Sequence, residues 1–245
     1  MKSLHAVFIL ISIALAGCGG GGGSSSTTPT PAPVTTAEGF WSGTASTGTK
    51  VALAILENGD TWGVYTSSNL IVGALHGTTT SSGTTLSGSG SDFNIPSKTV
   101  TPGTYSGTFA SKSSINVTTS IGSKFTGTYD ASYDTAASLT SLSGTFSGSG
   151  VSGTTSAQSA TVGISSLGVV SSTGIGCSAS GTVAPRPSGK NIFDVTITFT
   201  GTNCVLGNGT VTTGVAYYDA VIRQVLVMAL NSAKTDGFIY VGVKP

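Results

Sequence analysis

The sequence contains very little charge. Asp, Glu, Lys and Arg make up 8% of its 245 residues, whereas soluble domains average about 25%. Ten basic residues stand against nine acidic ones, and removal of Lys2 with the N-terminal segment would leave nine of each. Nucleic-acid binding depends on an excess of basic residues, so the composition excludes it. We also expect no electrostatic attraction of the chain as a whole to anionic lipid.

Histidine, cysteine and catalytic motifs are also scarce. The chain has two histidines and three cysteines, and His76 is the one histidine beyond the N-terminal segment. We expect His76 at a strand end, bonded to backbone or water. No G-x-S-x-G string, P-loop or paired-histidine motif occurs, and Asp130 and Asp134 are interpreted as turn residues rather than cation ligands. The sequence therefore predicts a protein that is not an enzyme and has no metal or cofactor.

The sequence has a single long apolar run, residues 6–15, and it is too short for a permanent transmembrane helix. The run follows Lys2 and ends in Leu-Ala-Gly-Cys at 15–18, an order typical of a secretion signal. This ending resembles the lipobox of bacterial lipoproteins. The resemblance implies that residues 1–17 are a signal peptide and that Cys18 carries diacylglycerol and palmitate.

Residues 18–37 lack the hydrophobic residues that a core requires. Five glycines are followed by Ser, Thr and Pro, a composition typical of a flexible tether that stiffens into an extended spacer. By resemblance to lipoproteins of Gram-negative bacteria, Gly19 after the lipidated cysteine implies the outer membrane. The leaflet that the protein faces, at the cell surface or in the periplasm, stays open.

Hydrophobic residues make up 38% of the whole chain. Beyond the tether they occur in short segments rich in Val, Ile, Thr, Phe and Tyr, separated by Gly, Ser and Asn. This pattern predicts an all-β protein, an antiparallel barrel or sandwich. We expect two lobes of about eight strands, at 38–141 and 142–245. The predicted strands are 38–45, 50–57, 60–65, 70–77, 84–90, 103–110, 113–119 and 124–130, then 142–149, 160–165, 169–172, 175–183, 191–200, 210–217, 221–230 and 237–243.

The clearest hairpin joins residues 50–57 to 60–65. Asn58-Gly59 between them favours a type I′ turn, which needs two positive φ angles. Residues 51–56 are apolar on both faces. We therefore expect this strand to be covered on both sides, by its own core and by a neighbouring lobe.

A short glycine-aromatic motif occurs three times, at 39–44, 103–108 and 144–148. Each copy predicts a strand with one large inward ring, and its glycines permit the coiling that barrels need. The first and third copies begin two halves of similar length, with 131–141 as the connector. The motif is compatible with internal duplication and equally with chance in a chain of this composition.

Two cysteines remain if lipid occupies Cys18. Cys177 and Cys204 form an even pair in an oxidising compartment, which favours a disulfide. The predicted strands 175–183 and 191–200 would pair across the loop at 185–189, so the bridge would close the open end of this hairpin.

The lipobox, the tether and the all-β lobes with the repeated motif resemble surface lipoproteins of the transferrin-binding-protein-B and factor-H-binding type. That resemblance implies a binder of host proteins. Residues 39–41, Gly-Phe-Trp, are also similar to the first strand of avidin-like and lipocalin barrels, in which a tryptophan closes one end.

Four aromatic residues are candidates for ligand binding, since aromatic faces suit apolar ligands and sugars alike. They are Trp41, Trp62, Tyr65 and Tyr105, and core packing is the alternative reading of each. The sequence favours an outer-membrane lipoprotein that binds a protein, a glycan or a small apolar ligand without catalysis. The alternative is a structural envelope lipoprotein with no dedicated ligand.

Overall fold

The structure, a computed structural model, describes residues 35–153, 155–174 and 176–245. The predicted signal peptide at 1–17, the lipidation site at Cys18 and the predicted tether as far as residue 34 lie outside the described residues. In the part that is described, no helix combines the length and the hydropathy that a membrane span requires.

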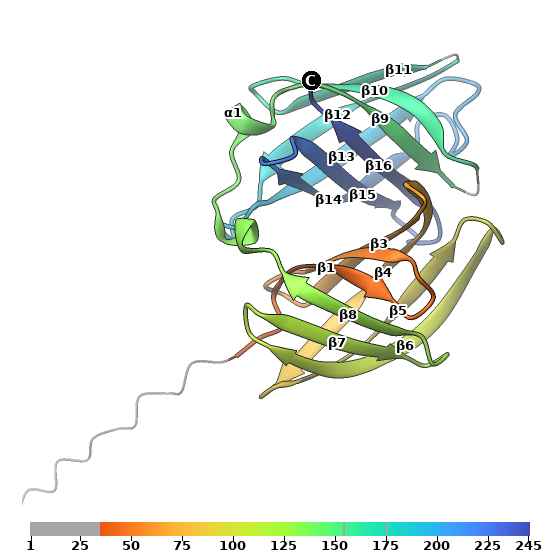
Figure 1. Cartoon of the computed structure of the whole chain (residues 1–245). Coiled ribbons are helices and arrows are strands. Elements are labelled where there is room, and N and C mark those ends of the chain that lie inside the picture. The colour runs from red at the N-terminus through yellow and green to blue at the C-terminus, as the bar shows by residue number, and fades with distance from the viewer. Residues whose placement is uncertain (1–34, 154, 175) are drawn as a thin grey trace, which may run out of the picture. The chain divides into compact units, whose positions relative to one another are not determined.

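The described chain forms two closed antiparallel barrels of eight strands each (Figure 1). Each strand pairs with the next along the chain, and β8 and β16 close the barrels on β1 and β9. The predicted all-β fold with two eight-stranded lobes is confirmed, and the lobes are barrels.

The N-terminal barrel contains β1 (Gly39–Ala45), β2 (Lys50–Ile55), β3 (Asp60–Ser67), β4 (Leu70–Ser82), β5 (Thr85–Asn94), β6 (Thr99–Ala110), β7 (Ser114–Thr119) and β8 (Lys124–Tyr129). The C-terminal barrel contains β9 (Gly144–Ser152), β10 (Gln158–Ile164), β11 (Val169–Gly174), β12 (Cys177–Pro185), β13 (Ile192–Thr200), β14 (Val211–Asp219), β15 (Gln224–Asn231) and β16 (Gly237–Val243).

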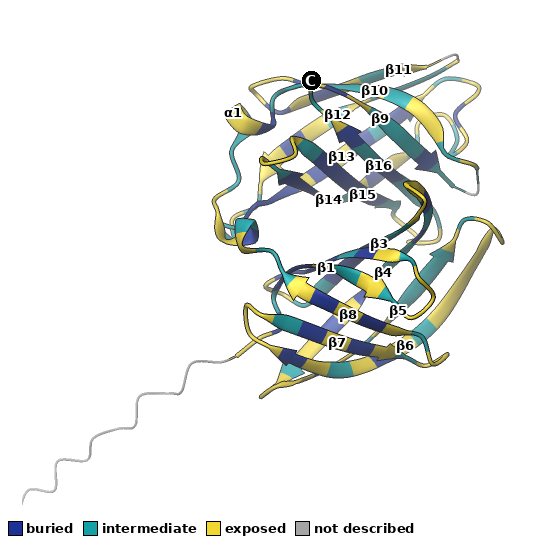
Figure 2. Cartoon of the chain, in the orientation of Figure 1, coloured by how far each residue is buried: buried dark blue, intermediate teal, exposed yellow. Residues whose placement is uncertain are grey.

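The strand β2 is covered on both faces, as its sequence predicts. Val51, Leu53 and Ile55 point into the N-terminal barrel. Ala54 on the opposite face, and Leu56 directly after the strand, pack into a second cluster that includes residues of the C-terminal barrel. Figure 2 shows buried residues along the strands of both barrels.

The turn between β2 and β3 differs from the prediction. Gly59 has a φ of 81°, whereas Asn58 does not have a positive φ, so the turn is not type I′. The Gly59 amide donates to the Leu56 carbonyl, as in a type I turn followed by a left-handed glycine. The Asn58 side chain accepts from the Asp60 amide at 3.0 Å, a local bond that favours this alternative. Two consecutive positive φ angles occur instead at residues 68–69, between β3 and β4.

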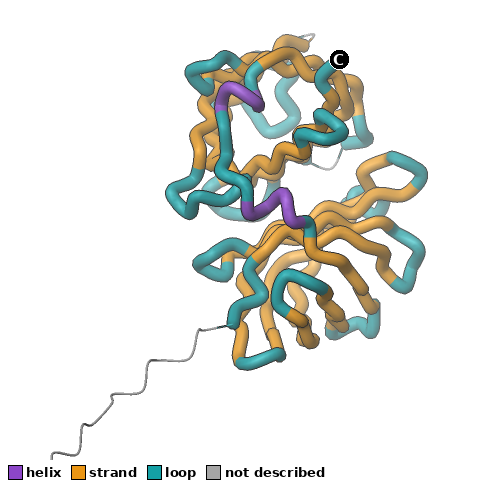
Figure 3. Tube along the Cα trace, turned by 60° about the vertical axis from the view of Figure 1, so that its left-hand side comes forward, coloured by secondary structure: helices purple, strands orange, loops and turns teal. Residues whose placement is uncertain are grey.

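The connector between the barrels contains two short helices, η1 (Ala131–Asp134) and α1 (Leu139–Leu142), drawn in purple in Figure 3. Asp130 caps η1, since its carboxylate accepts from the Ser132 amide at 3.0 Å. The same carboxylate accepts from the Tyr217 hydroxyl of the C-terminal barrel at 2.6 Å. Leu142 of α1 is fully buried in the C-terminal core.

The two barrels share an apolar interface formed by outward-facing residues. The rings of Phe40 and Tyr217 stack with centroids 3.8 Å apart. Arg186 adds a polar link, donating to Glu57 of the N-terminal barrel at 2.8 Å and to Asp194 of its own barrel at 2.6 Å. Fully or almost fully buried members of this interface include Leu56, Val64, Tyr133 and Ile192.

The predicted disulfide is confirmed, because Cys177 is bonded to Cys204. Cys177 begins β12, and Cys204 lies in the loop that follows β13. Ser178 pairs with Thr200 at the same end of the two strands. The bridge therefore closes the open end of the β12–β13 hairpin, as expected.

The three copies of the glycine-aromatic motif each place one ring inside a barrel. Trp41 and Tyr105 belong to the N-terminal core, and Phe146 belongs to the C-terminal core. The first and third copies occupy corresponding strands, β1 and β9. In each, the glycine after the ring pairs with a glycine of the last strand, namely Gly43 with Gly127 and Gly148 with Gly242.

Candidate functional site

One end of the N-terminal barrel is closed. Trp41 is fully buried, and its indole Nε1 donates to the Ala37 carbonyl at 3.1 Å. The Ala37 amide in turn donates to the Ser81 hydroxyl at 3.0 Å, which holds the segment before β1 against the end of β4. Trp41 is therefore packed into the N-terminal core at this end of the barrel, and the resemblance of residues 39–41 to avidin-like and lipocalin strands stays a prediction.

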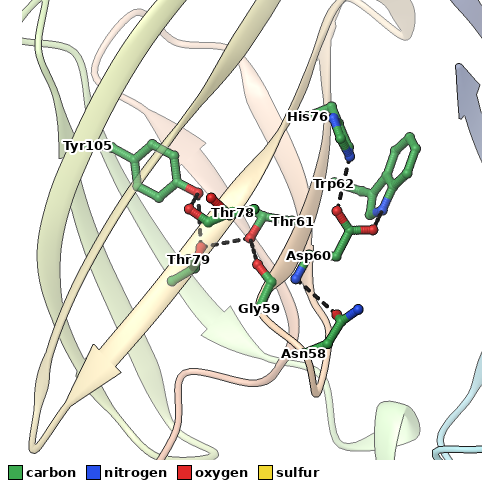
Figure 4. Close-up of polar contacts among 9 residues, drawn as sticks. All are labelled: Asn58, Gly59, Asp60, Thr61, Trp62, His76, Thr78, Thr79 and Tyr105. Atoms are coloured by element: carbon green, nitrogen blue, oxygen red, sulfur yellow. Dashed lines mark hydrogen bonds and ion pairs between the residues drawn. The ribbon is translucent and has the colours of Figure 1, made fainter. Parts of the chain in front are cut away.

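A chain of buried hydroxyl groups fixes Tyr105 inside the barrel (Figure 4). The Tyr105 hydroxyl donates to the Thr78 carbonyl at 3.1 Å and is hydrogen-bonded to Thr79 Oγ1 at 2.9 Å. Thr79 Oγ1 lies 2.7 Å from Thr61 Oγ1, and Thr61 donates to the Gly59 carbonyl at 2.9 Å. Because every hydroxyl has a partner, this network rigidifies the interior without a desolvation penalty.

Three neighbouring strands lack side chains at the same level of the barrel. Gly77 of β4 pairs with Gly90 of β5, and Gly90 pairs with Gly103 of β6. The alternation along β6 places Gly103 on the same face as the inward ring of Tyr105. A Cβ at Gly77 or Gly90 would clash with the backbone of the paired strand, so these two glycines permit close approach and strong coiling of the strands. At Gly103 a Cβ would meet only Ser120 Oγ at 3.5 Å, so this member of the glycine row leaves space inside the barrel.

The N-terminal barrel encloses a cavity of about 680 Å³. Ligand pockets are typically about 300–1,000 Å³, so this volume is that of a binding site. Its lining reaches the turns around Thr47, Pro96 and Ile121, which lie opposite the end closed by Trp41. These turns surround the mouth of the cavity. The apolar lining includes Val51, Leu53, Ile55, Leu75, Leu86 and Phe125.

The lining also contains polar side chains, several of them threonines and serines, with Lys124 and Asp92 as its two charged residues and Tyr65 beside Asp92. Burial raises the pKa of the Asp92 carboxyl, and a hydrogen bond with the Tyr65 hydroxyl offsets part of that rise. Burial, and then the neighbouring Asp92 charge, raise the pKa of Tyr65. In the described residues no cation pairs with Asp92. The cavity therefore offers a hydrogen-bond acceptor that the protein leaves only partly satisfied.

The C-terminal barrel is much fuller. Its interior cavity measures about 130 Å³, below the range typical of ligand pockets. Branched and aromatic side chains line this small cavity. They include Val162, Ile164, Val183, Val195, Phe199 and Val227.

A polar cluster lies on the outer face of the N-terminal barrel, at the interface (Figure 4). Asp60 accepts from Trp62 Nε1 at 2.7 Å and contacts His76 Nε2 at 3.0 Å. Burial alone would raise the pKa of Asp60, but these two partners outweigh burial and lower it. His76 is in the middle of β4 and is bonded to a carboxylate, so its predicted position at a strand end is wrong. The β4 strand extends well beyond the predicted residue 77 and pairs His76 with Trp62.

The cluster borders a recess of about 360 Å³ between the barrels. Arg186 and Lys234 add positive charge to its lining, and Asp194 adds negative charge. The side-chain hydrogen bonds of Asp60 in the described part of the chain are those with Trp62 and His76.

The four aromatic residues predicted as ligand contacts lie in three different parts of the structure. Tyr65 and Tyr105 line the cavity, Trp41 closes its end, and Trp62 faces the barrel interface. Their role in ligand binding stays a prediction. Asp92 was not among the predicted site residues. The sequence feature that could have indicated it is a lone carboxylate at an inward position of a strand whose other inward residues include two glycines.

The two aspartates of the connector have structural contacts. Asp130 caps η1, and Asp134 accepts from Lys112 at 2.8 Å and Lys190 at 2.7 Å. These two ammonium groups lower the pKa of Asp134 to about 2. Among the described residues, no cluster of three or more His, Cys, Asp or Glu side chains has the spacing of a metal site.

Comparison with protein-family models, with curated proteins and with solved structures finds no match for this chain. The fold and the cavity define it as a pair of up-and-down eight-stranded barrels, one hollow and one filled.

Proposed function

We propose that this protein is a lipid-anchored binding protein of the outer membrane, and that its N-terminal barrel takes up a small apolar ligand. The cavity of about 680 Å³ with an open mouth is the observation that supports the proposal. The anchor rests on the lipobox at 15–18, which leads to Cys18. After a high-salt wash, which removes proteins held by charge alone, a Cys18→Ala variant is expected in the soluble fraction, while the native chain stays with the membrane.

The chemistry of the lining defines the ligand class. Apolar side chains form most of the wall, so desolvation of an apolar body drives binding. Asp92, supported by Tyr65, accepts a hydrogen bond from a donor group of the ligand, such as a hydroxyl. We therefore propose a mostly apolar molecule with one hydrogen-bond donor.

Filling the cavity tests this function. Gly103 lines the cavity, and a Cβ added there would meet only Ser120 Oγ, at 3.5 Å. Gly103→Leu therefore fits without backbone strain and occupies ligand space. We expect it to weaken binding of the neutral fluorescent probe N-phenyl-1-naphthylamine at least about tenfold, or about 1.4 kcal/mol, with an unchanged melting temperature.

A matched control uses the same strand. Ser106 is exposed on the outer face of β6, and Ser106→Leu adds the same side chain outside the barrel. Its affinity for the probe should equal that of the native protein. Absence of probe binding to the native chain, or equal binding by both variants and the native chain, would favour the structural envelope protein instead.

A further inference from the structure

The end of the N-terminal barrel that carries the mouth also has a distinctive outer surface. Three lysines lie around it, namely Lys50 at the start of β2, Lys98 in the β5–β6 turn and Lys124 at the start of β8. All three are exposed. In the described residues no carboxylate forms an ion pair with any of them.

Exposed apolar residues occupy the same end. Leu70 follows the β3–β4 turn, Val100 lies near the start of β6, and Ile121 is in the β7–β8 turn. They are 60%, 45% and 85% exposed, and the other large apolar residues with such exposure belong to the C-terminal barrel. Ile121 sits at a turn position that usually holds a polar residue or glycine. We call these three residues and the three lysines the mouth surface.

We infer that the mouth surface docks on an anionic lipid bilayer. Lysines attract the lipid phosphates, and apolar turn tips insert at the boundary between headgroups and acyl chains. Among the carboxylates of the N-terminal barrel, Asp92 is the one near this end, and it faces the cavity. Asp236 of the C-terminal barrel lies in a recess with Phe93 and Ile95, beside the β5–β6 turn. The three exposed lysines outnumber these two carboxylates, so the local charge is positive although the whole chain is nearly neutral. Ile121 and Lys124 also line the cavity, but the inference rests on the exposure and charge of the mouth surface and needs no ligand in the cavity.

The test uses the full mature chain with Cys18→Ala, so that no lipid anchor contributes. Co-flotation is measured with vesicles of phosphatidylcholine alone and with vesicles that contain phosphatidylglycerol. We expect binding to the anionic vesicles only. This binding should be lost at about 0.5 M salt, because the ions then screen charges within a few ångströms. Each lysine replaced by Gln should weaken binding about fivefold, and the triple variant about a hundredfold.

Ile121→Ser tests the apolar part and has a close control. Leu167 occupies the same position before a left-handed glycine in the β10–β11 turn and is also 85% exposed. Ile121→Ser should weaken vesicle binding several-fold, whereas Leu167→Ser and Lys234→Gln should leave it unchanged. Gly103→Leu, which occupies part of the cavity, should also leave vesicle binding unchanged.

Several outcomes would overturn the inference. They are equal binding to neutral and anionic vesicles, full binding by the triple lysine variant, and an equal loss in Leu167→Ser. Binding to polyglutamate without binding to vesicles would likewise overturn it, and would assign the mouth surface to an acidic protein. Failure of vesicle binding with intact probe binding would leave the proposed ligand function in place.

Discussion

At the residue scale, Asp92 is placed at a cost to stability. Its carboxyl lies in an apolar lining, and burial raises its pKa above 3.8. The folded state therefore binds the proton more tightly than the unfolded state, and ionised Asp92 lowers the free energy of unfolding at neutral pH. A residue that lowers stability in this way is often retained for function.

Asp92→Asn is therefore expected to raise stability. Urea unfolding at pH 7 should give the variant a higher midpoint than the native chain, since Asn removes the buried charge and still accepts from Tyr65. The difference should shrink as the pH falls below 3.8, where the native carboxyl is protonated in both states. A lower midpoint for the variant at pH 7 would show that Asp92 is a stabilising residue.

The residues of the cavity also show what the sequence can predict. Large inward rings such as Trp41 and Tyr105 follow from alternation in a short strand. The glycine row does not, because strand pairing between β4, β5 and β6 brings Gly77, Gly90 and Gly103 together. Register across three strands depends on turn lengths that a single sequence does not define reliably.

At the element scale, the connector helix η1 depends on Asp134. Lys112 and Lys190 lower the pKa of its carboxyl to about 2. The folded pKa lies below the unfolded value, so the stabilisation is fully present above about pH 4 and is lost as the pH falls toward 2. Each contact of this partly exposed kind is worth about 0.2–1 kcal/mol.

Asp134→Asn should lower the free energy of unfolding by about 1 kcal/mol at pH 6 and by much less at pH 2, where the native carboxyl is largely protonated in the unfolded state and partly protonated in the folded state. Chemical denaturation at the two pH values measures this difference. The double variant Lys112→Gln/Lys190→Gln removes the ammonium partners of the same contacts and should give the same pH dependence. An equal loss at pH 6 and pH 2 would contradict an ionic origin.

All sixteen strands were predictable as elements, because short apolar runs between glycine-rich turns mark them plainly. The turn at Asn58-Gly59 was predicted wrongly, since the side chain of Asn58 forms a local bond to Asp60 that favours another turn type. The position of His76 was also predicted wrongly. In both cases a side chain forms a specific hydrogen bond, Asn58 with the Asp60 amide and His76 with the Asp60 carboxylate. Such bonds compete with the average conformational preference of the dipeptide or strand pattern from which the prediction was made.

At the scale of the whole molecule, the two barrels share one apolar interface, so their stabilities should be coupled. Both tryptophans, Trp41 and Trp62, belong to the N-terminal barrel and report on its unfolding. The disulfide of Cys177 and Cys204 belongs to the C-terminal barrel and is worth about 3–4 kcal/mol in the chain-entropy model. A change in the stability of the C-terminal barrel should therefore shift the unfolding midpoint that the tryptophans of the N-terminal barrel report.

The variant Cys177→Ala/Cys204→Ala should shift the unfolding midpoint measured by tryptophan fluorescence as well as that measured by circular dichroism. A shared interface makes the two barrels unfold as one cooperative unit. An unchanged fluorescence midpoint would show that the barrels unfold separately. Reduction of the native chain provides the control and should give the same shift as the double variant.

The sequence predicts the strands of the two barrels but not the difference between their interiors. The count of eight strands in each follows from the sequence pattern. Closure into barrels does not, because the same pattern is compatible with a sandwich. The cavity volumes, about 680 Å³ and about 130 Å³, depend on which inward positions face each other across the barrel. The mouth surface was likewise missed, because Lys50, Lys98 and Lys124 are far apart in sequence and their charge disappears in the neutral total.

The N-terminal barrel is hollow and the C-terminal barrel is filled. Native mass spectrometry of the mature chain with dodecan-1-ol, a mostly apolar molecule with one hydroxyl donor, tests this difference. We expect dodecan-1-ol to bind the native chain, and the bound fraction at the same concentration to be much smaller in Gly103→Leu. No binding to the native chain, or an undiminished bound fraction in Gly103→Leu, would contradict a ligand site inside the N-terminal barrel.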